Sequence, residues 1–320
     1  MDRRTFSKNA LGAIVGATTL GATTNAFAQD NKAGKPFNCK FAANLYKWTN
    51  ICAESVKGLS DVDKIQWWYD QGFRAMEDND MMKYPVEKQI ALAKKMESLG
   101  MDFGVFTSSI GVSGKSCWLT SFRDTEKQTP DKKAAIERIK KETARTIEVA
   151  KRVNAKWTTV VPGKADLTLE HGYQMANVVE QLKYAAEMCE KAGLIMVLEP
   201  LCFVNHPGLW LQKTADAYMV CKAVNSPSCK ILFDVYHQQH TEGTLIRNID
   251  YAWDEIAYYH LGDCPKRTEP LSGEINYKQL IKHIHEKGYR GIYGMEHRQS
   301  DKSLAGDKKL INAYREIDVA

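Results

Sequence analysis

The chain has 320 residues, of which 44% are hydrophobic and 26% are charged, a composition typical of an ordinary soluble protein with a sizeable core. Its formal net charge is only +5. A small excess spread along the chain gives no electrostatic case for a nucleic-acid partner, unless a basic groove forms only in three dimensions.

The N-terminal segment has the order of parts found in an export signal. Paired arginines open "MDRRTFSK", an apolar run rich in Gly, Ala and Thr follows, and the run ends in Ala26-Phe27-Ala28. This order predicts a cleavable signal peptide over residues 1–28, of the twin-arginine type, and hence a periplasmic or secreted protein. A disordered basic tail is the alternative. The apolar run is too short and too polar to predict a stable membrane anchor.

Beyond the leader, strand-like runs alternate with helical patterns. Strands are predicted at 39–46, 73–79, 101–109, 157–163, 194–200, 229–237, 256–263 and 291–298. Helices are predicted at 60–72, 85–100, 130–153, 167–193 and 214–225, with one more after each of the last three strands. Pro85 near a helix start and Gly193 just past a helix end support these boundaries.

Eight such strand–helix units within residues 29–320 predict a single-domain (β/α)8 TIM barrel. A doubly wound sheet also alternates, but it usually has fewer strands and a glycine-rich phosphate loop after the first one. The segment "ANLYKWTN" at residues 43–50 contains no such loop. The barrel is therefore favoured over the doubly wound sheet.

Four chemically active side chains stand at the ends of consecutive strands. These are Glu199 in "LIMVLEP", Asp234 in "KILFDVYH", His260 in "AYYHLGD" and Glu296 in "IYGMEH". Catalysis in such barrels takes place at the C-terminal ends of the strands, and buried carboxylates need a compensating cation. Three carboxylates and one imidazole suit one divalent metal ion, Mn²⁺, Mg²⁺ or Co²⁺. A loop-edge charge or a buried ion pair is the alternative for any single one of them.

The eight cysteines do not indicate a zinc site, because they form no CxxC pair. We expect most of them to be small buried hydrophobic side chains. Disulfide bonds stay open, since export would permit them.

Three segments of the sequence resemble the hydroxypyruvate isomerase family, which belongs to the xylose isomerase-like sugar isomerase/epimerase barrels. They are "VLEPLCFVNHPG", "FDVYHQQHTEGTLIRNI" and "HLGDCPKRTEPLSGEINYKQL". The resemblance runs from "FAANL" to "GIYGMEHR" and is densest in residues 194–298. Two positions depart from the hydroxypyruvate isomerases, which tend to have asparagine at Cys202 and glutamine at His260. Histidine at the second position is what the sugar epimerase branch uses.

The resemblance implies a role for each residue of the site. Glu199 and Glu296 would be acid/base catalysts as well as metal ligands, with Asp234 and His260 completing the metal shell. His237 and Arg267 would contact substrate oxygens. Glu77 and Lys164 are weaker candidates for the pocket. Glu274 is expected to hold a loop. The loop at residues 109–130 is expected to cap this face.

The implied reaction is proton transfer next to a carbonyl, through a metal-stabilised enediolate, on a small sugar or hydroxy-keto-acid substrate. Return of the proton to the neighbouring carbon gives isomerisation, and return to the same carbon from the other face gives epimerisation. A keto-sugar lyase or dehydratase at the same metal site is one alternative, and a catalytically inactive sugar-binding barrel is another. The sequence leaves a homo-oligomer open.

Overall fold

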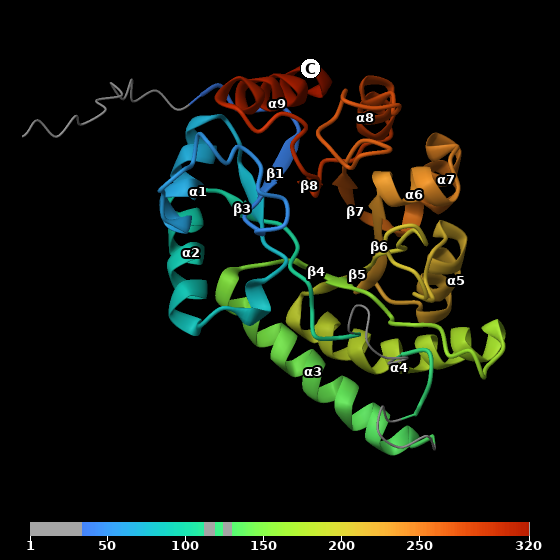
Figure 1. Ribbon diagram of the computed structural model, residues 1–320. Helices are drawn as coiled ribbons and strands as arrows, with labels where there is room; N and C mark the ends of the chain where they lie inside the picture. Colours follow the sequence, from blue (N-terminus) through green and yellow to red (C-terminus); the bar gives the residue numbers. More distant parts are fainter. Residues whose placement is uncertain (1–33, 112–118, 124–129, 320) are drawn as a thin grey trace, which may run out of the picture. The chain divides into compact units, whose positions relative to one another are not determined.

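The computed structural model of the protein describes residues 34–111, 119–123 and 130–319. Within them, eight parallel strands form one sheet in the order β3-β2-β1-β8-β7-β6-β5-β4. Helices surround the strands on the outside (Figure 1). This confirms the predicted (β/α)8 barrel. The signal peptide predicted at residues 1–28 lies outside the described residues.

Each predicted strand is present, although all eight are shorter than the sequence pattern suggests. The strands are β1 (Lys40–Asn44), β2 (Ala75–Glu77), β3 (Asp102–Phe103), β4 (Trp157–Val160), β5 (Ile195–Leu198), β6 (Cys229–Asp234), β7 (Ile256–Leu261) and β8 (Ile292–Met295). The sheet closes into a barrel between β3 and β4 through a single parallel bridge, Thr107 to Thr159. The backbone N–H of Thr159 donates to the carbonyl of Phe106 over 2.9 Å at this seam. Closure brings the C-terminal ends of all eight strands to one face.

The helices also lie where the sequence places them. They are α1 (Asp61–Asp70), α2 (Val86–Ser98), α3 (Lys132–Val153), α4 (His171–Ala192), α5 (Thr214–Val224), α6 (Val235–Thr241), α7 (Leu245–Ala252), α8 (Tyr277–Glu286) and α9 (Leu304–Ile317). The unit after β6 contains two helices where one was predicted. The first of them begins at once, because Asp234 caps it by accepting the backbone N–H of His237 over 3.2 Å.

Two apolar layers hold the barrel together. The larger one fills the space between strands and helices, and includes Phe41, Ile139, Leu182 and Tyr314. The smaller one fills the barrel interior, with Ala42, Ala75, Val105, Val197, Leu232, Tyr258 and Ile292. The interior is thus packed with side chains below the face where the strands end.

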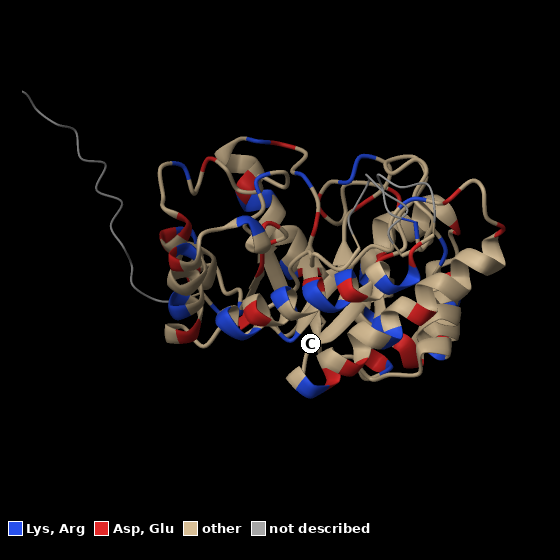
Figure 2. Ribbon diagram, turned by 90° about the horizontal axis from the view of Figure 1, so that it is seen from below, with Lys and Arg blue, Asp and Glu red and all other residues tan. Residues whose placement is uncertain are grey.

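Charged residues of both signs are interspersed along the outer helices (Figure 2). None of the helices in the described part of the chain is both long enough and apolar enough to span a bilayer. All seven cysteines that the structure describes are buried and free, as expected for small hydrophobic side chains. Cys117 lies outside the described residues.

Candidate metal and substrate site

The polar site follows directly from the two-residue period of the strands. On each strand, the residue two positions after a member of the apolar interior layer is the next one whose side chain faces inward. Those positions are Asn44 above Ala42, Glu77 above Ala75, Glu199 above Val197, Asp234 above Leu232, His260 above Tyr258 and Gly294 above Ile292. The strand ends therefore deliver a ring of polar side chains onto an apolar floor.

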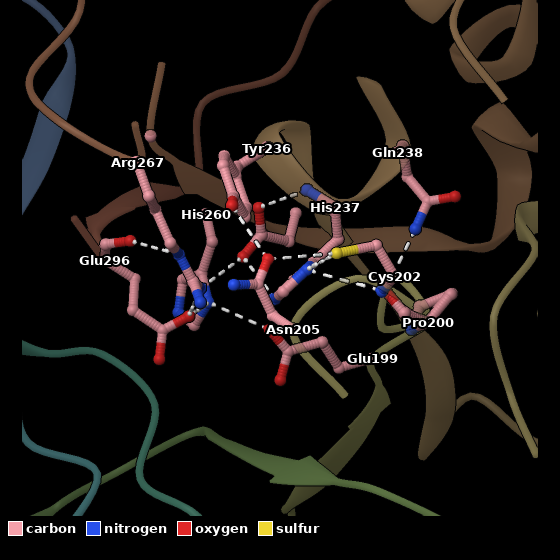
Figure 3. A network of polar contacts seen from close by, with 12 residues as sticks. Glu199, Pro200, Cys202, Asn205, Tyr236, His237, Gln238, His260, Arg267 and Glu296 are labelled. Carbon is pink, nitrogen blue, oxygen red and sulfur yellow. Dashed lines mark hydrogen bonds and ion pairs between the residues drawn. The ribbon is translucent and has the colours of Figure 1, made fainter. Parts of the chain in front are cut away.

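The four predicted metal ligands come together at this face. Glu199 follows β5, Asp234 ends β6, His260 lies near the end of β7 and Glu296 follows β8. One ligand atom from each of the four lies within 4.8 Å of the others, and all four residues are buried. Figure 3 shows Glu199, His260 and Glu296 converging on one point. Because parallel neighbouring strands pair Asp234 with His260 in register, the cluster is fixed by the backbone of the sheet.

His260 lies between the two glutamates. Its Nδ1 is 2.9 Å from Oε2 of Glu296 and 3.4 Å from Oε1 of Glu199. Burial alone would lower the pKa of His260, but the charges of Glu296 and Glu77 outweigh it and raise the pKa well above its usual range.

Within the described residues, Arg267 is the buried arginine that contacts this cluster. Its Nη2 donates to Oδ2 of Asp234 over 2.9 Å and to Oε2 of Glu296 over 2.7 Å. The guanidinium also lies over the rings of Trp48 and Tyr236, with its carbon 4.9 and 5.0 Å from the two ring centres. These hydrogen bonds and ring contacts hold the guanidinium in place. Arg267 is therefore a buried part of the site and not a surface loop cation.

The loop between β7 and α8 holds Arg267 in position. Asp263 closes the loop by accepting the backbone N–H groups of Gly273 and Ile275, each over 3.0 Å. Arg267 itself has a φ of +53°, a left-handed conformation that costs energy for a residue with a side chain. Glu274, which was expected to hold this loop, is exposed and accepts a hydrogen bond from Gln239. The loop hydrogen bonds to Asp263 perform that task.

His237 lies beside the cluster on the first turn of α6. Its Nε2 is 3.6 Å from Oδ2 of Asp234, and its Nδ1 is 3.2 Å from Sγ of Cys202 (Figure 3). Burial, together with the charge of Arg267, holds the pKa of His237 well below its usual range. The imidazole is therefore neutral at physiological pH.

Crowding of the acids perturbs their protonation. Burial, followed by the charge of Glu296, raises the pKa of Glu199 to about 7. Burial raises the pKa of Asp234 to about 6 although the charge of Arg267 opposes it. Burial also acts to raise the pKa of Glu296, but His260 and Arg267 outweigh it and lower the pKa below its usual range. Acids so close together take up protons unless a cation balances their charge.

The donor set fits a divalent cation. Oε1 of Glu199 and Nδ1 of His260 are buried and have no hydrogen-bond partner within the described residues. Buried polar atoms of this kind almost always have a partner. Three carboxylates and one imidazole form a mostly oxygen donor set, which suits Mn²⁺, Mg²⁺ and related ions.

One contact of the site has no signal in the sequence. Nδ2 of Asn79 donates to Oε1 of Glu296 over 2.6 Å, from the loop after β2. Glu77, a weak candidate from the sequence, is fully buried behind His260, with its Oε2 3.5 Å from Nε2 of His260. The side chain of Lys164 is exposed and makes no contact with the cluster. The middle of the predicted capping loop, residues 112–118 and 124–129, lies outside the described residues.

Two curated relatives have sequences similar to this chain. Hydroxypyruvate isomerase of Escherichia coli is 32% identical over 172 residues, which cover 54% of this chain and 66% of that enzyme. The 2-oxo-tetronate isomerase of Cupriavidus necator is 26% identical over 268 residues, which cover 83% of this chain and 95% of the relative. Both relatives are isomerases, and by this similarity the chain is an enzyme of the isomerase class.

Solved structures share the fold at lower sequence identity. A family 2 AP endonuclease from Brucella melitensis aligns with a TM-score of 0.69 and 21% identity, covering 84% of this chain and 96% of its own. A 3-keto-D-glucoside 4-epimerase from E. coli aligns with a TM-score of 0.66 and 15% identity, covering 87% and 98%. At these identities the likeness shows the fold alone.

A family model described as "Xylose isomerase-like TIM barrel" matches residues 65–316, which is most of the chain. The matched range contains all four residues of the candidate metal cluster. The chain therefore belongs to the xylose isomerase-like TIM barrel family.

Proposed function

We propose that this protein is a divalent-metal-dependent isomerase or epimerase that moves a proton next to the carbonyl of a short hydroxy-carbonyl substrate. The observation that carries the proposal is the cluster of Glu199, Asp234, His260 and Glu296, with ligand atoms within 4.8 Å of one another on a packed barrel floor. A hydroxy keto acid is the first substrate class to test, since the two curated relatives are named for hydroxypyruvate and 2-oxo-tetronate.

The four residues of the cluster would hold the cation. When bound, a divalent ion polarises a substrate carbonyl and stabilises the negative charge that develops on its oxygen. Glu199 follows β5 and Glu296 follows β8, so the two carboxylates would reach a substrate from different strands, while both lie near Nδ1 of His260. One glutamate removes the carbon-bound proton and the other delivers a proton to the enediolate.

Arg267 and His237 would orient the substrate. Asp234 and Glu296 hold Arg267 against the cluster through its Nη2 and Nε groups, which leaves Nη1 as the group to bind a substrate oxygen. Nε2 of His237 is buried and makes no hydrogen bond to another described residue. A substrate hydroxyl or carbonyl oxygen can use both groups, which would keep the carbon-bound proton in line with a glutamate.

The test is turnover in deuterated water. The purified protein, loaded with Mn²⁺, Mg²⁺ or Co²⁺, is offered hydroxypyruvate, 2-oxo-tetronate and a panel of ketoses and 3-keto-sugars. Deuterium in the product reports proton abstraction, and its position separates isomerisation from epimerisation. Glu199→Gln and Glu296→Gln should keep the fold and lose both turnover and exchange.

Three results would contradict the proposal. Full deuterium exchange in both glutamine variants would show that the glutamates do not transfer the proton. Stoichiometric sugar binding with no exchange in the wild-type protein would indicate a binding protein, and an unsaturated product would indicate a lyase or dehydratase at the same cluster. Gln239→Ala, which alters an exposed contact with Glu274, is the control for the effect of substitution itself.

We also propose that the protein is exported. The support is the sequence order of residues 1–28, with Arg3 and Arg4 before an apolar run and a small-x-small end. Fractionation of cells that express the full chain should place the shortened protein in the periplasm or the medium. Replacing both arginines by lysine should leave the full-length precursor in the cytoplasm, and export of that variant at the normal rate would contradict a twin-arginine route.

A further inference from the structure

A fully buried carboxylate lies inside the barrel, beside the candidate metal cluster. Glu77 ends β2 and is 0% exposed, in a layer where barrels usually carry branched aliphatic side chains. Burial of a carboxylate costs several kcal/mol unless hydrogen bonds or a neighbouring positive charge compensate it. The neighbours of Glu77 therefore indicate what this side chain is for.

Three groups converge on the carboxylate from two strands. Nδ2 of Asn44, at the end of β1, donates to Oε1 over 2.9 Å. The hydroxyl of Tyr258 on β7 donates to Oε2 over 2.7 Å. Two residues further along the same strand, Nε2 of His260 lies 3.5 Å from that same Oε2.

The barrel has glycines where a larger residue would displace this arrangement. A Cβ atom at Gly294 on β8 would lie 2.6 Å from Cδ2 of His260 and too close to Oε2 of Glu77. A Cβ atom at Gly104, just after β3, would collide with the hydroxyl of Tyr258 and lie 3.1 Å from Cβ of Glu77. Both separations are shorter than ordinary van der Waals contact, so glycine at these positions leaves room for Glu77 beside the imidazole.

The two nitrogens of His260 thus face different partners. Nδ1 faces Glu199 and Glu296, at 3.4 and 2.9 Å, within the candidate metal cluster. Nε2 faces Glu77, on the side away from that cluster. A metal-ligating imidazole usually donates its second N–H to a carboxylate or carbonyl, which sets the tautomer and the ring orientation.

We propose that Glu77 is a positioning residue for the metal site: it attracts the N–H of Nε2 of His260, and so leaves Nδ1 unprotonated and directed at the cation. At 3.5 Å the contact is long for a hydrogen bond, so attraction between the carboxylate and the ring N–H carries the effect. The inference rests on the metal site proposed above and adds a residue that touches neither the metal nor the substrate.

A purely structural role is the competing explanation. Through Asn44 and Tyr258, Glu77 also ties β2 to β1 and β7. A tie of that kind would change the stability of the barrel but would not act specifically through His260. Metal affinity and the state of the His260 ring distinguish the two roles.

The first experiment is calorimetric titration of metal-free protein with Mn²⁺. Glu77→Gln replaces one acceptor oxygen by an NH₂ group while keeping the size of the side chain. We expect this change to weaken Mn²⁺ binding about 10–100-fold, as for other outer partners of metal ligands. The matched control is Asp307→Asn, which alters another carboxylate that is 1% exposed and accepts hydrogen bonds from Ser55 and Gln299, neither of which belongs to the cluster. Its Mn²⁺ affinity should equal that of the wild type.

A double-mutant cycle tests whether Glu77 acts through His260. In a His260→Ala background, Glu77→Gln should change Mn²⁺ affinity less than about twofold, because the group it orients is gone. A loss of affinity as large as in the wild-type background would overturn the proposal and leave the structural role. An unchanged affinity in the single variant would overturn it as well.

Histidine NMR gives a readout that needs no variant. In ¹⁵N-histidine-labelled wild-type protein loaded with diamagnetic Zn²⁺, the signals of His260 should show a protonated Nε2 and a metal-bound Nδ1. A metal-bound Nε2 would overturn the proposal even if Glu77→Gln failed to fold. A wild-type protein that binds neither Mn²⁺ nor Zn²⁺ would instead overturn the metal site itself, so the two failures are distinguishable.

Discussion

Nδ2 of Asn79 lies 2.6 Å from Oε1 of Glu296, joining the loop after β2 to the end of β8. The other oxygen of Glu296 faces Arg267 and His260. Each oxygen of this glutamate therefore accepts a hydrogen bond, one from Asn79 and the other from Arg267. Oδ1 of Asn79 is buried without a partner in the described structure, so the same side chain has an acceptor available for a substrate hydroxyl.

Asn79→Ala should lower kcat/KM for proton transfer about 10–100-fold. A hydrogen bond to a charged group contributes about 1.5–3 kcal/mol, and its loss would let the carboxylate of Glu296 turn away from the substrate. Steady-state kinetics on the substrate found by deuterium exchange measures the effect. Gln239→Ala removes an amide–carboxylate hydrogen bond that is exposed and outside the site, and it should leave the kinetics unchanged. Equal kinetics in both variants would remove Asn79 from the site.

Gly294→Ala should impair the site through crowding. The added methyl group would press on Glu77 and on Cδ2 of His260, in a region with no free space. Overpacking of this kind costs about 1–3 kcal/mol of stability, and here it would also turn the imidazole and weaken metal binding. Thermal unfolding with and without Mn²⁺ separates the two effects.

Gly172→Ala is the matched control for that substitution. Gly172 lies in the first turn of α4 and a Cβ atom there would meet nothing within 4 Å. Alanine is favoured over glycine in a helix, so this variant should be as stable as the wild type or slightly more stable. If both alanine variants bound Mn²⁺ normally, the crowding argument for Gly294 would be wrong.

The sequence was sufficient to predict the cluster because each of its members breaks a local rule. Glu199, Asp234 and His260 stand in the inward register of apolar strands, where an aliphatic residue is the default. Their strands are neighbours in the barrel, so side-by-side placement follows from parallel pairing once the fold is predicted. At these positions the local sequence pattern and the predicted fold therefore indicate the same cluster of polar side chains.

Other parts depended on contacts that no local pattern encodes. Asn79 and Glu296 are 217 positions apart, and nothing near Asn79 distinguishes it from an ordinary loop asparagine. Arg267 was found only through the family resemblance, because its burial depends on the loop that Asp263 closes. The strand predicted at 101–109 ends at Phe103. Beyond Phe103 this segment pairs with β4 through a single bridge, at Thr107, and one bridge does not continue the strand.

Removal of the metal should lower both activity and stability. A ligand present at 100 times its Kd stabilises the folded state by about 2.7 kcal/mol, so a chelator should lower the Tm by several degrees. Added Mn²⁺, Mg²⁺ or Co²⁺ should restore the Tm and the activity. Asp234→Asn supplies the control, because it lacks one ligand oxygen and its Tm should respond little to the chelator. A Tm that is identical with and without chelator in the wild type would contradict the metal site.

Asp78 should make the stability of the barrel depend on pH, independently of the metal cluster. Its carboxylate is 1% exposed and accepts hydrogen bonds from the backbone N–H of Asp80 and the hydroxyl of Tyr84. Burial raises the pKa of Asp78 to about 6, above the value near 3.9 expected in the unfolded chain. The folded state therefore holds this proton more tightly, so its stabilising contribution is present below pH 4 and is lost as the pH rises through 6.

Asp78→Asn should remove that loss, because an amide stays neutral and can still accept the hydrogen bond from Tyr84. Relative to the wild type, the variant should gain about 1–3 kcal/mol between pH 4 and pH 7, seen as a rise in its relative Tm. Asp166 gives the opposite case: burial opposes ionisation, but hydrogen bonds from Thr168 hold its pKa below the usual range. Asp166→Asn should therefore lose stability relative to the wild type at pH 7 and recover as the pH falls towards 3. A relative Tm that changes in the same direction for both variants would show that general charge effects, and not these two carboxylates, set the pH dependence.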